Sequence, residues 1–260
     1  MDALAEGGIA RSGGVARAMS ELPRLRDFTS ARVGLSRAGN SLPTSELLTL
    51  QLAHARAREA VYSRLDEQSL ALELNPIVGD LLFVRSAAPD RATYLRRPDL
   101  GRRLSDDSRQ MIVERKGKFD AVFVIADGLS ALAVQLHAAR LIEATLSLLE
   151  RADWTLAPFV VVEQGRVAIG DEIGERVGAA MSVVLIGERP GLSSADSLGV
   201  YLSWNPHPGL TDADRNCISN IRAEGLSNAA AASKLVFLMN ESRRRKLSGV
   251  GLKEEARALE

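Results

Sequence analysis

The chain has 260 residues, of which 46% are hydrophobic and 25% charged, and its basic and acidic side chains are equal in number. This composition is typical of a folded globular protein, and it excludes intrinsically disordered, fibrous and low-complexity chains. A net charge of zero gives no support to a dominant role on nucleic acid or on a membrane surface. The single cysteine, Cys217, excludes an internal disulfide and a multi-cysteine metal site, and it favours a reducing, cytoplasmic setting.

The beginning of the chain contains acids, glycines and arginines where a secretory signal peptide needs an apolar core. No run of residues approaches the roughly 18 uninterrupted apolar residues of a membrane-spanning helix. We therefore expect neither export nor a membrane span. The glycines near the start, without a sustained hydrophobic period, predict that residues 1–20 form a mobile arm.

The first predicted regular element is an amphipathic helix that begins near Thr44. Residues 80–86 form an apolar run of strand length, and a second helix is predicted to start at Ser105, where Asp106 and Asp107 favour the positive end of the helix dipole. Basic residues outnumber acidic ones up to residue 118, and the balance then reverses. Two domains, or two solvated arginine faces, explain this reversal equally well. The apolar stripe of the first helix comprises Leu47, Leu48, Leu52, Ala55, Tyr62 and Leu65.

After residue 118 short apolar runs alternate with helical patterns. Continuous apolar strands separated by helices are typical of a parallel sheet that is buried on both faces. We therefore predict an α/β fold with a doubly wound parallel sheet. The predicted strands are residues 121–126, 159–162 and 182–186, and the predicted helices are residues 129–149, 171–177 and 228–246.

Three glycine-containing loops follow these strands, at residues 127–130, 165–167 and 187–192. Right-handed crossovers bring the loops to the carboxyl edge of the sheet, where open α/β sheets bind ligands. Glycine lets the backbone approach a large flat ligand, and the charged residues beside it offer hydrogen bonds at the rim. Tight-turn closure and helix capping explain any one of these loops alone.

Several common sites are excluded by their missing motifs. The sequence has no G-x-G-x-x-G after a strand and no P-loop, and His54, His137 and His207 are too scattered for a zinc or di-iron site. Cys217 has no hydrolase signature around it, so a buried or ligand-touching thiol is the better interpretation. RNA binding and salt bridges to a protein partner both remain as explanations of the arginine-rich segment at residues 94–104.

Eight blocks of this sequence, in order, resemble the small (light) subunit of the bacterial enzyme ethanolamine ammonia-lyase. They cover the chain from about residue 29 to residue 252. The blocks are ARVGLSRAG (31–39), HARAREAV (54–61), YLRRPDLGRRL (94–104), ADGLSA (126–131), QGRVAIGDEIGE (164–175), LIGERPGLSSADSLGVY (185–201), DRNCISNI (214–221) and KLSGVGL (246–252).

The resemblance implies a chain that is one half of an adenosylcobalamin-dependent enzyme, which converts ethanolamine to acetaldehyde and ammonia by a radical mechanism. In this family the large subunit is a TIM barrel that holds the substrate, and the small subunit closes over cobalamin at the interface between the two in a hetero-oligomer. The implied fold is a small, mostly helical N-terminal domain, here residues 21–104, followed by a Rossmann-like domain at residues 105–260. No nucleic-acid or membrane partner is implied.

Three cobalamin contacts of the family fall on intact motifs of this sequence. They are Val167 of the G-R-V loop, Glu188 of G-E-R-P-G and Cys217 of R-x-C-I-S-N, with Arg166 as a further candidate. The family binds cobalamin with its own dimethylbenzimidazole on cobalt, which agrees with the absence of a D-x-H-x-x-G motif here. We assign no catalytic residue and no metal ligand to this chain.

The sequence departs from the family pattern at Ala53 and Glu59, where the family often has aspartate, which puts an intersubunit salt bridge in doubt. The start of the chain is also short compared with members whose extended start is associated with solubility or with packaging in a bacterial microcompartment, so packaging is left open. The alternative from a different class is a stand-alone α/β domain that binds a small molecule or nucleotide and has a regulatory role.

Overall fold

The computed structural model describes residues 28–29, 31–149 and 154–252 of a chain that divides into two units, residues 1–55 and 56–260. Among the described residues of the first unit, the helix is the beginning of α2 (Thr44–Tyr62), which continues into the second. The predicted helix at Thr44 is confirmed, but its leucine stripe is not buried, because Leu47, Leu48 and Leu52 are exposed. The predicted arm at residues 1–20 lies outside the described residues.

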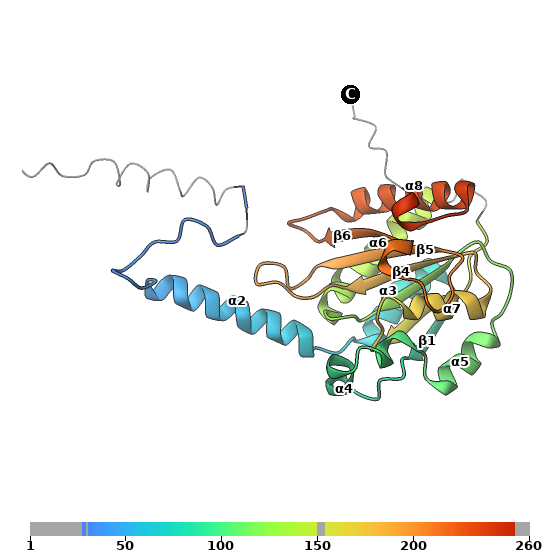
Figure 1. The fold of residues 1–260 in the computed structure, drawn as a ribbon, viewed down its shortest axis with the longest axis horizontal. Helices are drawn as coiled ribbons and strands as arrows, with labels where there is room; N and C mark the ends of the chain where they lie inside the picture. The colour runs from blue at the N-terminus through green and yellow to red at the C-terminus, as the bar shows by residue number, and fades with distance from the viewer. Residues whose placement is uncertain (1–27, 30, 150–153, 253–260) are drawn as a thin grey trace, which may run out of the picture. The chain divides into compact units, whose positions relative to one another are not determined.

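The second unit is built on a six-stranded mixed sheet with the strand order β1-β3-β2-β4-β5-β6 (Figure 1). The first four strands in that order run parallel, whereas β5 runs antiparallel to both of its neighbours. The α/β class and the predicted strands are confirmed. The strands are β1 (Leu81–Arg85), β2 (Val122–Ala126), β3 (Phe159–Glu163), β4 (Met181–Gly187), β5 (Leu198–Trp204) and β6 (Arg215–Ile221).

The prediction of a parallel sheet is confirmed for β1, β3, β2 and β4 but does not extend to β5 and β6, two antiparallel strands that were not predicted. A parallel neighbour needs a long crossover, usually a helix, but residues 188–197 between β4 and β5 contain no helix. The chain therefore turns back, and Gly187 pairs with Leu198 in antiparallel register. Because β5 reverses the direction and β6 reverses it again, β6 runs parallel to β4 and ends at the same edge of the sheet.

Helices cover both faces of the sheet. Along β2, Phe123 and Ile125 point into one apolar cluster, while Val122 and Val124 point into the other. The continuous apolar run of this strand is explained because both faces are buried. The first cluster includes residues of α3 (Glu67–Val78), α6 (Ala131–Leu149) and α8 (Asn228–Arg245), and the second includes residues of α5 (Asp106–Val113) and α7 (Ile169–Val177).

Helix starts follow the local capping chemistry. Ser105 accepts a hydrogen bond from the Ser108 N–H at 3.3 Å, which confirms the predicted start of α5. Asp66 caps α3 in the same way through the Ser69 N–H at 3.0 Å. The predicted helices in the second half of the chain are confirmed as α6, α7 and α8, whereas α3 and the short α4 (Arg91–Arg96) were not predicted.

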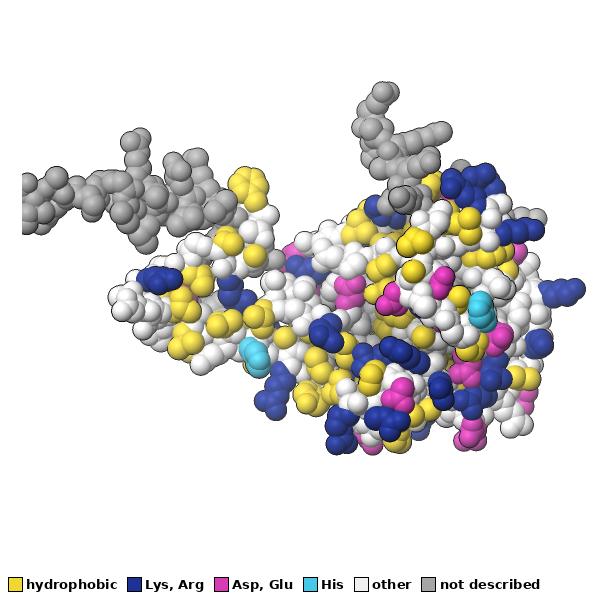
Figure 2. Space-filling model, viewed as in Figure 1, with side chains coloured by type: hydrophobic (Ala, Val, Ile, Leu, Met, Phe, Trp, Pro, Cys, Tyr) yellow, Lys and Arg dark blue, Asp and Glu magenta, His cyan; other side chains and the backbone are white. Residues whose placement is uncertain are grey.

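The sheet extends into the segment before residue 104, because β1 pairs with β3. The division into domains at residues 21–104 and 105–260 stays a prediction. Among the described helices α6 alone has the length and apolar composition of a membrane span, and half of its most apolar window is buried in the protein. In Figure 2 basic and acidic side chains are intermixed on the visible surface of the second unit.

Candidate functional site

The three predicted loops meet at the carboxyl edge of the parallel strands. They follow β2, β3 and β4, and together they line a cavity of about 400 Å³ that we call the edge groove. The prediction that these loops gather at one edge is confirmed. The groove is lined by Tyr94, Gly128, Leu129, Arg166, Val167, Ile186, Gly187, Glu188, Arg189 and Tyr201.

Two glycines allow the loop after β2 to lie directly against the end of β4. The Leu129 N–H donates a hydrogen bond to the Gly187 carbonyl at 2.9 Å. A Cβ on Gly187 would lie 2.0 Å from the Ser130 carbonyl oxygen, and one on Gly128, whose φ is +59°, would lie 2.3 Å from the Gly187 carbonyl oxygen. The wall of the groove at this point therefore consists of backbone without side chains. A larger residue at either glycine would clash with the facing backbone.

A buried ion pair fixes the loops after β2 and β3. Asp127 is 2% exposed and accepts hydrogen bonds from Arg91 Nη1 and from the Gly165 N–H, both at 3.1 Å. Arg91 also donates to the Gly128 carbonyl at 2.9 Å and to the Val61 carbonyl at 2.8 Å. Burial raises the pKa of Asp127 to about 6, while Arg91 opposes that rise. The ion pair with Arg91 therefore holds these loops in place.

Tyr94 and Arg166 form a stacked pair in the wall of the groove. The Tyr94 hydroxyl donates to the Gly165 carbonyl at 2.9 Å, and the Arg166 guanidinium lies over the Tyr94 ring, 4.3 Å from its centroid. The Arg166 N–H donates to the Gly101 carbonyl at 2.7 Å. Arg166 Nε is buried and has no hydrogen-bond partner in the described structure, whereas the side chain as a whole is half-buried and lines the groove.

Glu188 links the end of β4 to the end of β6. Its carboxylate accepts hydrogen bonds from the Ser197 and Ser219 hydroxyls, both at 2.5 Å, and from the Asn220 N–H at 3.2 Å. Since a carboxylate has about four acceptor positions, these three bonds leave about one for a ligand donor. The first task of Glu188 is therefore to fix the shape of the groove.

Cys217 lies beside the groove and does not line it. It stands opposite Tyr201 in the β5–β6 register, and Tyr201 lines the groove. The thiol is exposed, yet the surrounding protein removes enough water to raise its pKa, and a hydrogen bond with Tyr201 opposes this effect. The structure thus brings Val167 and Glu188 together and connects Cys217 to them through one tyrosine.

Helix α4, which supplies Arg91 and Tyr94, was not predicted from the sequence pattern. The available signal was Asp90, whose side chain caps α4 by accepting from the Thr93 N–H at 2.7 Å. That signal locates the helix, but it says nothing of the contacts with Asp127 and Gly165, which only the tertiary fold creates.

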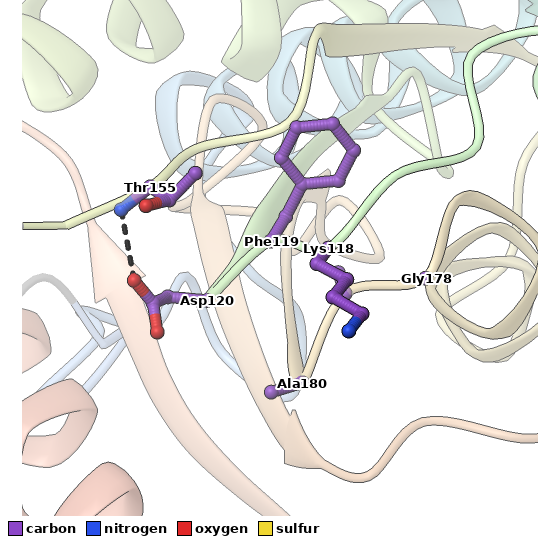
Figure 3. Close-up of a pocket in the computed structure, with 7 residues that line it drawn as sticks. Lys118, Phe119, Asp120, Thr155, Gly178 and Ala180 are labelled. Atoms are coloured by element: carbon purple, nitrogen blue, oxygen red, sulfur yellow. Dashed lines mark hydrogen bonds between the residues drawn. The ribbon is translucent and has the colours of Figure 1, made fainter.

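A separate cavity of about 340 Å³ lies at the opposite edge of the sheet, before β2, β3 and β4 (Figure 3). Its carboxylate, Asp120, already accepts from the Thr155 N–H at 2.8 Å and pairs with Arg243 at 3.3 Å. Because its acidic group is engaged within the protein and none of the three loops reaches it, we take the edge groove as the candidate site. Within residues 28–29, 31–149 and 154–252, no group of three or more His, Cys, Asp or Glu side chains has the arrangement of a metal site.

The fold and the groove define a class of protein, an α/β protein with a polar ligand groove at the carboxyl edge of its sheet. The family model for the ethanolamine ammonia-lyase light chain (EutC) matches residues 19–253. Similar proteins named ethanolamine ammonia-lyase small subunit occur in Pseudomonas fluorescens, with 55% identity over 89% of this chain and 86% of that protein, and in Azotobacter vinelandii, with 56% identity over 90% and 88%. The chain therefore belongs to the ethanolamine ammonia-lyase light-chain family, as the sequence motifs predicted.

Proposed function

We propose that this chain is the small subunit of an adenosylcobalamin-dependent ethanolamine ammonia-lyase, and that its edge groove contacts cobalamin at the interface with a TIM-barrel large subunit. The observation that carries the proposal is the groove itself, in which Val167 and Glu188 meet and which Tyr201 connects to Cys217. The relatives are named small subunits, which supports a larger partner for this chain.

The groove has the chemistry of a site for one edge of a corrinoid. Its volume of about 400 Å³ is far too small for a whole corrin ring with its amide side chains, so this chain would cover one part and the partner the rest. The half-buried Val167 offers an apolar wall, and the backbone wall at Gly128 and Gly187 admits a flat group closely. Arg166, which lines the groove and is half-buried, offers hydrogen-bond donors to a ligand.

In this proposal the residues of the chain bind and position, and none is catalytic. Adenosylcobalamin supplies the radical chemistry that converts ethanolamine to acetaldehyde and ammonia. Glu188 holds the β4 and β6 ends in one geometry, and Arg91 holds the other two loops through Asp127. A groove fixed in this way binds its ligand without the entropy cost of ordering its loops, and it excludes water from the covered edge of the ligand.

Two further features support assembly with a partner and the proposed architecture. Leu47, Leu48 and Leu52 on α2 are exposed, and exposed apolar stripes are typical of surfaces that another protein covers. Helices on both faces of four parallel strands support a Rossmann-like, doubly wound description of the sheet. The single cysteine supports a reducing cytoplasm as the location, within or outside a microcompartment.

Co-expression with the large subunit tests the proposal. Acetaldehyde formation from ethanolamine should require this chain, the large subunit and adenosylcobalamin together. A large subunit that is fully active alone, and that never co-purifies with this chain, would refute the proposal and favour the stand-alone binding domain.

The site is tested by Glu188→Ala in the assembled enzyme, with Glu175→Ala on the exposed surface of α7 as the matched control. We expect the first change to weaken cobalamin binding while the subunits remain assembled, because three loop hydrogen bonds are lost. Cobalamin affinity that is equal in both variants would remove Glu188 from the site.

A further inference from the structure

A second cavity adjoins the edge groove and is rich in arginine. It has a volume of about 420 Å³ and shares Arg166 and Val167 with the groove. Arg102 and Arg215 also line it, and Asp212 is the acidic residue of its lining. We call it the arginine cavity.

The charges of the arginine cavity leave a positive surplus. Arg215 is 7% exposed and is neutralised by the buried Asp171, with which it forms a close ion pair, and it also contacts Asp212 at 3.4 Å. Within the described part of the chain, neither Arg102 nor Arg166 forms an ion pair. Arg102 and Arg166 therefore line this cavity without an ion-pair partner, beside one acidic residue, Asp212.

Buried donors in the cavity lining also lack acceptors. Arg166 Nε and Arg215 Nε are both shielded from solvent, and neither has a hydrogen-bond partner in the described structure. A buried N–H without an acceptor costs free energy, so such groups call for an explanation. An oxyanion in the cavity would offer several acceptor oxygens and a negative charge to the arginine side chains that line it.

Arg166 is held in place before any ligand arrives. Its guanidinium lies over the Tyr94 ring, and its Nη2 donates to the Tyr94 carbonyl at 3.4 Å. Gly101 permits this packing, because a Cβ there would lie 2.8 Å from Arg166 Cγ. A side chain fixed between two cavities is suited to contact one ligand that extends into both.

We propose that the arginine cavity binds the phosphodiester of the cobalamin nucleotide tail while the corrin edge lies in the edge groove. This inference rests on the proposed function and adds to it an anion subsite made by Arg102 and Arg166. A phosphodiester keeps one negative charge throughout the working pH range, which matches the positive surplus of the cavity.

The test compares cyanocobalamin with dicyanocobinamide, a corrinoid that lacks the nucleotide tail and its phosphate. Both are titrated by equilibrium dialysis against the assembled enzyme that carries Arg102→Gln, Arg166→Gln or the control Arg103→Gln. Arg103 is also exposed and follows Arg102 in the chain, but it does not line the cavity. Because the contact is a charge-assisted hydrogen bond, we expect Arg102→Gln and Arg166→Gln to weaken cyanocobalamin binding by about tenfold and dicyanocobinamide binding by less than about twofold. The control should change neither.

Inorganic phosphate separates a corrinoid subsite from a site for a free anion. Competition by phosphate against cyanocobalamin, but not against dicyanocobinamide, would support the inference. Phosphate that raises the melting temperature without displacing cyanocobalamin would overturn it, because the cavity would then serve a separate anion. Equal losses for both corrinoids, or no loss for either, would overturn it as well while leaving the proposed function intact. If neither corrinoid binds the unmodified assembly, the proposed function and this inference both fail.

Discussion

Replacing Gly187 by alanine should destabilise the second unit by about 1–3.5 kcal/mol. The new Cβ would lie 2.0 Å from the Ser130 carbonyl oxygen and 2.7 Å from the Asp127 carbonyl oxygen, and neither is the flexible end of a side chain. The loop after β2 must therefore move. Overpacking costs about 1–3 kcal/mol, and the loss of the Leu129–Gly187 hydrogen bond costs about 1 kcal/mol more. The smaller entropy of the unfolded alanine variant offsets only about 0.4–1 kcal/mol.

The matched control is Gly251→Ala. The nearest atom to its new Cβ, other than those of its chain neighbours, is Leu247 Cδ1 at 3.6 Å, an ordinary contact, so we expect a change within about 1 kcal/mol. Urea titration followed by the fluorescence of Trp154 and Trp204, both in the second unit, gives the free energy of unfolding of each variant. If the two variants unfold at the same urea concentration with equal slopes, the close approach at Gly187 does not hold the loop, and the reasoning is refuted.

Three further predictions concern single side chains. Burial alone would raise the pKa of Glu172, but hydrogen bonds from the Leu104 N–H at 2.8 Å, from Arg109 at 2.8 Å and from a further arginine lower it. The ionised carboxylate therefore stabilises the fold at pH values above its unfolded pKa near 4.5. This stabilisation is lost as the pH falls through the lower pKa of the folded state. Glu172→Gln should cost about 1–2 kcal/mol at pH 7, and thermal melts at lower pH should show this difference shrinking; a constant difference would contradict the assigned shift. Tyr94→Phe removes a buried donor to the Gly165 carbonyl and should cost about 1–2 kcal/mol by urea titration, whereas an unchanged midpoint would show that the hydroxyl bond is dispensable. Because its pKa is raised, the Cys217 thiol should react with iodoacetamide more slowly at pH 7 than cysteine in solution does, and the reaction should become faster as the pH rises. In the assembled enzyme cobalamin should protect the thiol, and peptide mass spectrometry measures the modified fraction. A modified fraction that cobalamin leaves unchanged would place the thiol away from the ligand.

The central strands were predictable because burial on both faces leaves a continuous apolar run in the sequence. β2 and β4 are buried along their whole length, and the sequence shows this directly. β6 is buried at every third position and carries Arg215, Asn216 and Asn220, so it has no such run. Its place in the sheet depends on pairing with β5, which no local pattern reveals.

The candidate site was predictable to the extent that it consists of loops. A glycine with a charged neighbour after each strand, together with the rule that parallel strands share a carboxyl edge, placed Val167 and Glu188 in one groove. The network behind the groove was not predictable, because the Arg91–Asp127 pair joins segments far apart in the chain. The position of Cys217 beside the groove, and not in its lining, likewise follows from the register with Tyr201.

The strand order has a consequence for the folding of the protein during its synthesis on the ribosome. β1 is made before β2 and β3, yet its neighbour in the finished sheet is β3, and β1 forms an edge of that sheet. During synthesis β1 therefore remains unpaired while β2 and the whole of α6 emerge from the ribosome. An apolar strand in that state is open to pairing with the wrong chain. The last residue of β1, Arg85, is exposed and charged, and a charge on an unpaired edge strand opposes pairing with another chain. The order of the strands thus makes the interval between β1 and β3 the stage of translation at which a chaperone would protect this chain most.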